Sequence, residues 1–272
     1  MNNNNIHPTA IISKGAVIPD SCKIGAFCIL GSGVKLAENV TLMANVYIEG
    51  DVEIGEGSVI FPFAVIGVKS QDLKYKGEPA KVVIGKNNQI REHVTIHLAT
   101  QDGGGITKVG DNCLLMVASH VAHDVQVGNN VIIDNNVLLA GHVVIEDNVI
   151  VGGGSAVHQF CRIGEGSFIG GMSGVTEDIV PFALYTGVRN TGEINGLNLV
   201  GLRRRGYTRE AIHEITEAYN LIFSKEKTFS ENIEKLKLLS TENIGIKTLV
   251  KFLTSDKSRS VCTVYKNYKK EK

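Results

Sequence analysis

The stretch Ser119–His142 reads SHVAHDVQVGNNVIIDNNVLLAGH and carries an aliphatic residue at every sixth position. The same period of six runs through most of the chain, at Ile6, Ile12, Ile18, Ile24, Leu30, Leu36, Leu42, Ile48, Ile54, Ile60, Ile66, Ile84, Ile90, Ile96, Val109, Leu115, Val121, Val127, Ile133, Leu139, Ile145, Val151, Val157, Ile163, Ile169 and Val175. An amphipathic helix has a period near 3.6 and cannot keep this spacing. Hexapeptide repeats are typical of a parallel β-helix, in which each hexad forms one short side and points its aliphatic residue inward. The sequence therefore predicts a mainly β solenoid.

Three such sides close one coil of eighteen residues, and successive coils stack as paired strands about 4.8 Å apart. Two segments interrupt the hexads, Val68–Val83 and Gln101–Lys108, and we expect both to loop out from a corner. Insertions on a regular scaffold often carry function. Four of the five cysteines occupy a small inward position and are interpreted as core residues: Cys22, Cys28, Cys113 and Cys161.

The pattern becomes helical after Asn190, with apolar residues three or four apart. Thr208 and Ser230 are suitable N-caps for helices in this segment. We therefore predict a β-helix domain at residues 1–190 and a helical domain at residues 191–272 that caps the open end of the solenoid.

The composition of the chain indicates the cellular compartment in which the protein is expected. The 272 residues contain no apolar run long enough for a transmembrane segment, and the N-terminal MNNNNIHPTA lacks the features of a secretory signal. The odd number of cysteines (5), without paired spacing, favours a reducing compartment, so we expect a cytoplasmic protein.

Charge is balanced over the whole chain, with 28 basic and 28 acidic residues, but Gly201–Lys272 holds 16 basic and 9 acidic ones. This basic end indicates an acidic partner or phosphate groups, and a solvated lysine-rich surface explains the charge equally well. No nucleic-acid partner is expected.

Residues eighteen apart should stack, which places Gly141 over His123 and His142 over Asp124. The hexad positions beside them point inward, so we expect these four residues to face outward at or near a corner. An imidazole oriented by a carboxylate can act as a general base, and the N–H of a glycine can donate to an oxyanion. No serine or cysteine nucleophile accompanies the histidine, which favours direct transfer between two substrates.

Two other interpretations of these histidines remain open. His120, His123 and His142 offer three imidazoles, the number that a catalytic zinc site uses, but Asp124 and Gly141 would then have no role. The histidines are also explained as surface residues at a solvent-exposed corner. We expect no metal.

Six motifs together carry a family resemblance: QDLKY (Gln71–Tyr75), IREHVTIH (Ile90–His97), HVAHD (His120–Asp124), LAGH (Leu139–His142), AVHQF (Ala156–Phe160) and GLRRRGY (Gly201–Tyr207). With them the chain resembles, over essentially its whole length, the acyl-carrier-protein:UDP-N-acetylglucosamine O-acyltransferases of lipid A biosynthesis.

The resemblance implies a left-handed β-helix that forms a homotrimer with active sites between subunits. It implies transfer of a 3-hydroxyacyl group from acyl carrier protein to the glucosamine 3-hydroxyl of UDP-N-acetylglucosamine. No cofactor is implied beyond the phosphopantetheine arm that the donor carries. The basic helical end would then attract the acidic carrier protein.

The resemblance also implies roles for individual residues. His123 matches the general base, Asp124 its orienting carboxylate, and Gly141 the oxyanion donor. Gly171 matches the position that measures acyl length, where a glycine favours a long chain, although the adjoining Met172 narrows the groove. The remaining substrate-binding positions are Asp72, Lys74, His120, His142, His158, Gln159, Asn198, Arg204 and Arg205.

Some properties are left open by these residues. Val200 stands where relatives carry an acidic residue near the uridine. The motifs do not distinguish a 3-hydroxyl acceptor from a 3-amino one. The related N-acyltransferases carry a uridine-binding domain ahead of the β-helix, whereas the hexads here begin at Ile6. A non-catalytic β-helix has no reason to gather His123, Asp124 and Gly141 at one edge.

Overall fold

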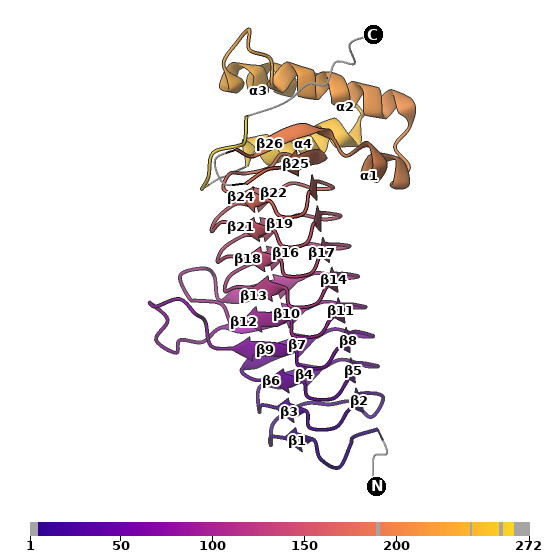
Figure 1. The fold of residues 1–272 in the computed structure, drawn as a ribbon, viewed down its shortest axis with the longest axis vertical. Helices are drawn as coiled ribbons and strands as arrows, with labels where there is room; N and C mark the ends of the chain where they lie inside the picture. Colours follow the sequence, from indigo (N-terminus) through magenta and orange to yellow (C-terminus); the bar gives the residue numbers. More distant parts are fainter. Residues whose placement is uncertain (1–4, 189–190, 240, 256–257, 264–272) are drawn as a thin grey trace.

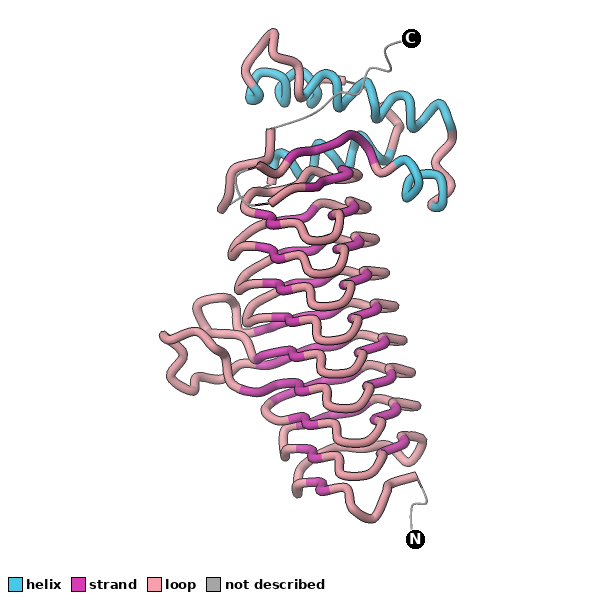
Figure 2. The backbone as a smooth tube through the Cα atoms, in the orientation of Figure 1, coloured by secondary structure: helices cyan, strands magenta, loops and turns pink. Residues whose placement is uncertain are grey.

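The computed structural model describes residues 5–188, 191–239, 241–255 and 258–263. The chain winds into a long solenoid of stacked coils with helices at its C-terminal end (Figure 1). Each coil contributes one short strand to each of three parallel sheets, which form the three flat faces of the solenoid (Figure 2). The predicted β-helix of hexapeptide repeats is confirmed.

We number the faces in the order in which the chain passes through one coil. Face 1 consists of β1 (Ile11–Ile12), β3 (Ile29–Leu30), β6 (Tyr47–Ile48), β9 (Val65–Val68), β12 (Thr95–His97), β15 (His120–Val121), β18 (Leu138–Leu139), β21 (Ala156–Val157) and β24 (Gly174–Val175). Face 2 consists of β4 (Val34–Leu36), β7 (Asp51–Ile54), β10 (Lys81–Ile84), β13 (Ile106–Val109), β16 (Gln126–Val127), β19 (Val144–Ile145) and β22 (Arg162–Ile163). Face 3 consists of β2 (Lys23–Ile24), β5 (Thr41–Leu42), β8 (Val59–Ile60), β11 (Gln89–Ile90), β14 (Leu114–Leu115), β17 (Ile132–Ile133), β20 (Ile150–Val151), β23 (Phe168–Ile169), β25 (Ala183–Thr186) and β26 (Glu193–Leu197).

The register of the strands follows the hexads. His120 pairs with Leu138, and Leu138 pairs with Ala156, so residues eighteen apart lie directly above one another. The aliphatic residues of the same strands, Val121 and Leu139, are fully buried in the interior of the coil. The four cysteines interpreted as core residues are also buried, as predicted.

Both insertions leave the solenoid at one corner, the corner between face 1 and face 2. The first lies between β9 and β10, at residues 69–80, and the second between β12 and β13, at residues 98–105. They project to the same side of the molecule in Figure 1. Both predicted excursions are present, but Val68, Lys81–Val83 and Ile106–Lys108 belong to the flanking strands, and the second excursion begins at residue 98 and not at Gln101. The turns that follow them along this corner hold His123 and His142.

The C-terminal segment begins with a strand and continues with helices. β26 pairs antiparallel with β25 and so extends face 3, within the segment where we expected only helices. The helices are α1 (Leu199–Arg204), α2 (Arg209–Ile222), α3 (Phe229–Lys237) and α4 (Ile244–Thr254).

Two caps were predicted for these helices. Thr208 caps α2, as predicted. The N-cap of α3 is Thr228 and not Ser230, because Thr228 and Glu231 form a reciprocal capping box that fixes the start of the helix two residues earlier.

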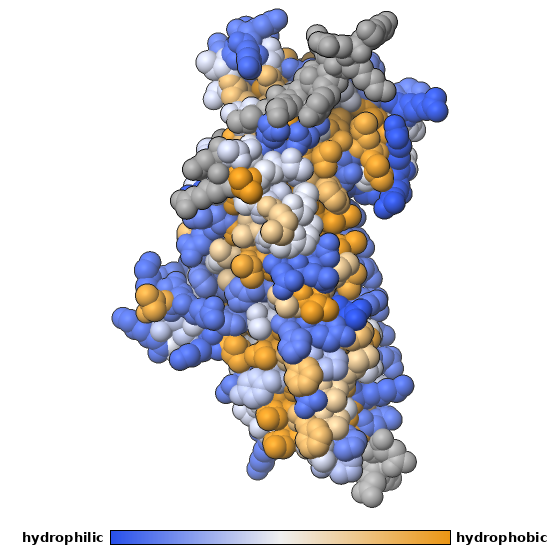
Figure 3. All heavy atoms as spheres, in the orientation of Figure 1, coloured by the Kyte–Doolittle hydropathy of each residue, from blue (hydrophilic) through white to orange (hydrophobic). Residues whose placement is uncertain are grey.

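Within the described residues, no helix is long and apolar enough to cross a membrane. On the face visible in Figure 3, apolar side chains gather over the N-terminal coils. Exposed apolar residues of these coils include Ile11, Val17, Phe27, Ile29 and Phe63.

The solenoid core predicts unequal effects for two neighbouring leucines of β18. Leu139 is fully buried, whereas Leu138 is 52% exposed. Leu139→Ala should lower the free energy of unfolding by about 2–5 kcal/mol, because it leaves a cavity inside the coil. Leu138→Ala, the matched control, should cost about 0.5 kcal/mol or less. Urea denaturation followed by circular dichroism measures both, and equal losses would contradict the assigned inward and outward positions.

Candidate active site

Two adjacent coils bring His123, Asp124 and His142 together at the corner between face 1 and face 2. His123 and Asp124 lie in the turn between β15 and β16, and His142 lies one coil further, between β18 and β19. His123 Nδ1 is 2.8 Å from Asp124 Oδ2. Because a carboxylate accepts hydrogen bonds, Nδ1 carries the ring proton and Nε2 keeps a free lone pair. This is the tautomer that a general base requires.

Asp124 is buried, and both of its oxygens are hydrogen-bonded. The Thr100 N–H donates to Oδ1 at 2.9 Å, and the Thr100 hydroxyl donates to Oδ2 at 2.7 Å. A third bond, from the Asp124 N–H to Thr107 Oγ1 at 2.9 Å, fixes the backbone of the turn. The Thr100 N–H, the Thr100 hydroxyl and the Thr107 hydroxyl thus hold Asp124 in one position. The carboxylate of Asp124 in turn orients His123.

We expected His123 and Asp124 to face outward, and they do leave the core, but they are only 7% and 3% exposed. The second insertion covers Asp124, and Gly141 of the next coil packs against the ring of His123. A Cβ on Gly103 would lie 2.0 Å from Asp124 Cγ, so only a glycine lets the insertion pack so closely.

Sequence reasoning missed Thr100 and Thr107. Thr100 lies in the second insertion, 24 residues before Asp124, whereas Thr107 lies in β13, 17 residues before it. The eighteen-residue count therefore aligns neither of them with Asp124. The available signal in the sequence was that two hydroxyl-bearing residues lie close to a glycine-rich excursion, where they could act as hydrogen-bond partners for Asp124.

Gly141 lies directly against the ring of His123. A Cβ at Gly141 would be 2.4 Å from His123 Cε1 and 2.5 Å from Nε2, far inside van der Waals contact. Among the described residues, the Gly141 N–H donates to no protein group. This N–H is therefore available to donate to a ligand near the His123 ring.

Two further histidines, His142 and His120, lie near this centre. His142 Nε2 is 3.8 Å from Asp124 Oδ2, and its ring stacks on Phe160 at 4.4 Å between centroids. Burial lowers the pKa of His142. His120 Nδ1 is 2.7 Å from Thr95 Oγ1, and burial, with smaller effects from the neighbouring histidines, lowers its pKa to about 4. His120 is therefore neutral at pH 7.

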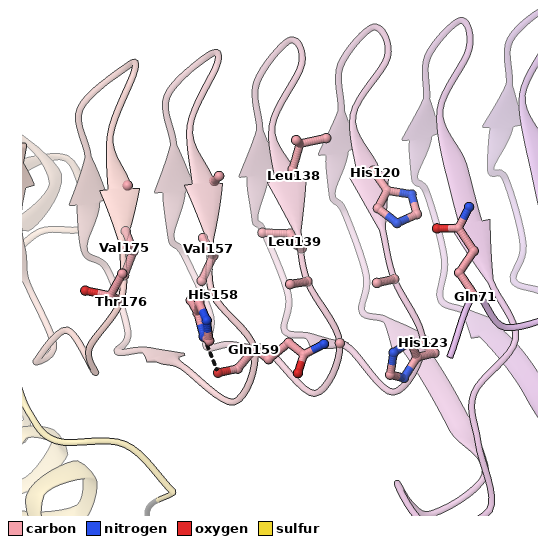
Figure 4. Close-up of a pocket in the computed structure, with 15 residues that line it drawn as sticks. Gln71, His120, His123, Leu138, Leu139, Val157, His158, Gln159, Val175 and Thr176 are labelled. Carbon is pink, nitrogen blue, oxygen red and sulfur yellow. Dashed lines mark hydrogen bonds between the residues drawn. The ribbon is translucent and has the colours of Figure 1, made fainter. Parts of the chain in front are cut away.

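An open groove of about 610 Å³ runs along face 1 beside these residues. Figure 4 shows His120 and His123 toward one end and Val175 and Thr176 toward the other, with His158 and Gln159 between them. The exposed apolar side chains of the lining are those of Leu138 and Ala156 on the outer surface of face 1. Such a surface fits an alkyl chain, and the polar groups along one edge fit a second, hydrophilic ligand.

The first insertion brings Asp72 near the histidines. The Lys74 N–H donates to Asp72 Oδ1 at 2.8 Å and lowers the pKa of that carboxyl, with smaller contributions from the charges of His123 and His142. Lys74 itself borders a separate hollow with Gln101 and Asp102.

The remaining predicted positions lie at the other two corners. Asn198 caps α1 and donates to the Gly166 carbonyl at 3.0 Å, between face 2 and face 3. Arg205 Nη1 is 3.6 Å from Glu165 Oε1, and both of its terminal nitrogens are buried, so its guanidinium reaches a ligand only after the side chain moves. Gly171 lies between face 3 and face 1. One chain does not gather these residues around His123.

Arg204 lies beside them, exposed near the end of α1, and is likewise far along the coil from His123. Asn198, Arg204 and Arg205 therefore occupy a different edge of the solenoid from the histidines.

The structure changes the composition of the alternative metal site. The ligand atoms of His123, Asp124 and His142 lie within 4.8 Å of one another, whereas the predicted trio contained His120. The oxygens of Asp124 already accept hydrogen bonds from Thr100 and His123, which leaves this group poorly suited to a cation.

Family models and a related protein sequence show which family the chain belongs to. The bacterial transferase hexapeptide model matches residues 33–68 and 106–141, and the model for domain 2 of UDP N-acetylglucosamine O-acyltransferases matches residues 178–262. An acyl-[acyl-carrier-protein]–UDP-N-acetylglucosamine O-acyltransferase from Rhizobium johnstonii is 43% identical over 94% of this chain and 93% of its own length. The chain belongs to this O-acyltransferase family.

Solved structures of O-acyltransferases agree with that assignment. The UDP-N-acetylglucosamine acyltransferase of Francisella novicida is 36% identical, with a TM-score of 0.91 over 97% of this chain and 95% of its own. The Arabidopsis enzyme is also 36% identical, with a TM-score of 0.82 over 94% and 99%. The chain is thus an acyltransferase with the left-handed β-helix of this O-acyltransferase family.

Because Gly141 lies against His123, adding one methyl group at Gly141 should strongly reduce the rate of acyl transfer. Gly141→Ala should displace the imidazole and lower the rate of acyl transfer on the order of 10², because small misplacements of a catalytic group are costly. Gly31→Ala is the matched control, since its Cβ would meet nothing nearer than 3.3 Å and lies far from the histidines. Steady-state rates measure the difference, and a Gly141→Ala enzyme as fast as the control would refute the contact.

Proposed function

We propose that this protein transfers a 3-hydroxyacyl group from the thioester of acyl carrier protein to the glucosamine 3-hydroxyl of UDP-N-acetylglucosamine, the first step of lipid A biosynthesis. The names of the relatives support these substrates. The observation that carries the mechanism is the arrangement of His123, with Asp124 on Nδ1 and Gly141 against Nε2.

In the proposed reaction His123 Nε2 takes the proton of the 3-hydroxyl as its oxygen attacks the thioester carbon. The negative charge moves to the carbonyl oxygen, where the Gly141 N–H donates to it. The C–S bond then breaks, and the imidazolium returns its proton to the leaving thiolate. Asp124 stabilises the imidazolium and keeps Nδ1 protonated throughout.

A covalent acyl-enzyme is not part of this proposal, because the chain offers no suitable nucleophile at the groove. All five cysteines are buried. Burial raises the pKa of Cys113 to about 11 and that of Cys161 to about 12, so neither thiol ionises near neutral pH. No dissociable cofactor or metal is needed, since the phosphopantetheine arm arrives with the donor.

The proposed substrate positions come from the family resemblance. We assign the glucosamine to Asp72, Lys74 and His142, at the end where the first insertion meets the histidines. The apolar stretch along face 1 takes the acyl chain toward Gly171, with His120 as a support for the histidine cluster. The nucleotide diphosphate lies by His158 and Gln159 at the same edge.

A homotrimer completes this site. Asn198, Arg204 and Arg205 lie at a different corner from His123 within one chain, so they reach a nucleotide at the groove only from a neighbouring subunit. The exposed apolar residues of the N-terminal coils provide surface for that contact. We place the protein in the cytoplasm, where free buried thiols persist.

His123→Ala tests the general base. Its loss should lower the rate of transfer on the order of 10²–10⁴. His213→Ala is the control, because His213 is exposed on α2, away from the groove. The assay is acyl transfer from purified 3-hydroxyacyl carrier protein to UDP-N-acetylglucosamine. Full activity of His123→Ala would remove the residue from this role.

Salt dependence tests the attraction of the carrier protein. Residues 201–272 carry 16 basic and 9 acidic side chains, and screening of their field should weaken binding of the acidic carrier. We expect kcat/KM for the carrier protein to fall as ionic strength rises from about 0.01 M to about 0.15 M, where the Debye length drops from about 30 Å to about 8 Å. An unchanged kcat/KM would contradict steering by this segment.

A further inference from the structure

Arg259, near the end of the described chain, contacts the groove residues His158 and Gln159. Its Nε donates to the Gln159 carbonyl oxygen at 3.0 Å, and its Nη2 lies 2.9 Å from His158 Nδ1. The contacts join residues that are 100 and 101 positions apart in the sequence. No sequence motif pointed to Arg259, because its segment follows the helices and lies outside the repeats.

The chain anchors Arg259 to this place through its neighbours. The Asp178 N–H donates to the Ser260 carbonyl at 2.8 Å, and the Cys262 N–H donates to the Asp178 carbonyl at 2.9 Å. Val261 and Cys262 are buried, at 5% and 1% exposed. The segment thus forms a parallel β-bridge between Val261 and Asp178, beside the corner that holds His158.

The contact with Arg259 determines where His158 carries its proton. A guanidinium has donors only, so His158 Nδ1 must accept, and the proton of the neutral ring is on Nε2. The Gln159 carbonyl is 3.3 Å from the same Nδ1, but two acceptors form no hydrogen bond, so the Arg259 Nε–H satisfies that oxygen instead. His158 therefore presents an Nε2–H donor.

We propose that Arg259 is a positioning residue for the nucleotide sugar. It fixes the His158 tautomer and the Gln159 backbone, so that the His158 Nε2–H meets an oxygen of the substrate diphosphate, and it adds a positive charge beside that anion. The helical C-terminal segment thereby contributes to the groove of its own chain. The identity of the ligand in this inference rests on the proposed function. The tautomer of His158 rests only on its contact with Arg259.

Substitution of Arg259 tests the effect on substrate. Arg259→Met keeps the aliphatic stem and removes both donors, and Arg259→Lys keeps one charge. We expect the KM and the Kd for UDP-N-acetylglucosamine to rise roughly ten- to a hundredfold in Arg259→Met, the usual cost of losing a hydrogen bond to a charged group, here the bond from the His158 Nε2–H to the diphosphate. The rise should be smaller in Arg259→Lys. The kcat at saturating sugar should change little.

The control is Arg209→Met, which removes the same charge from an exposed position at the start of α2. The melting temperature of each variant shows whether it folds. Equal Kd values for UDP-N-acetylglucosamine in Arg259→Met and Arg209→Met would overturn the proposal. A rise in KM for the acyl carrier protein alone would overturn it as well.

The tautomer is measured without reference to activity. The chain has 8 histidines, so ¹⁵N-histidine labelling gives few signals, and His158→Gln assigns one of them. We expect His158 to carry its proton on Nε2 in the wild type and to lose that preference in Arg259→Met. A wild-type ring protonated on Nδ1 would overturn the contact, even if Arg259→Met fails to fold. Absence of acyl transfer by the wild type would instead refute the proposed function.

Discussion

Parallel pairing between coils that close after eighteen residues is the constraint on which the rest of this structure depends. In the coils without insertions, each inward aliphatic residue packs above the one eighteen positions earlier, and each outward residue is stacked in the same way. Outward side chains that are one coil apart in the sequence therefore lie next to each other on a face, and the sequence alone shows which functional groups are neighbours. Strand pairing continues across both insertions, since Lys81 pairs with both Asp51 and Ile106. The register shifts once beside them, between Ile96 and His97, where the second insertion begins.

The corner that holds His123 and Asp124 shows what the second insertion contributes. A buried carboxylate is costly unless hydrogen bonds compensate it, and Asp124 receives them from Thr100 and His123. Thr100 and Gly103 come from the second insertion, which both satisfies the charge and excludes water from it. The regular coil supplies the positions of His123 and Gly141, and the irregular loop supplies their electrostatic environment.

The helical segment is more than a cap on the solenoid. Arg162 of the last face 2 strand binds buried Asp178 at 2.8 Å and lies over the ring of Phe252 at 4.2 Å, which locks α4 to the coil end. The chain that follows α4 then returns to the corner beside His158. The same packing that closes the hydrophobic core thus delivers Arg259 to the groove.

The sequence by itself determined the solenoid, the eighteen-residue stacking and the pairing of His123 with Gly141, because a strict period converts position in the chain into position in space. It also located both insertions as breaks in that period. Only the tertiary structure decided what the irregular segments touch: the burial of Asp124 under Thr100, the antiparallel β26, the start of α3 at Thr228 and the contact of Arg259 with His158. These segments have no repeat, so their contacts depend on long-range packing that no local spacing encodes.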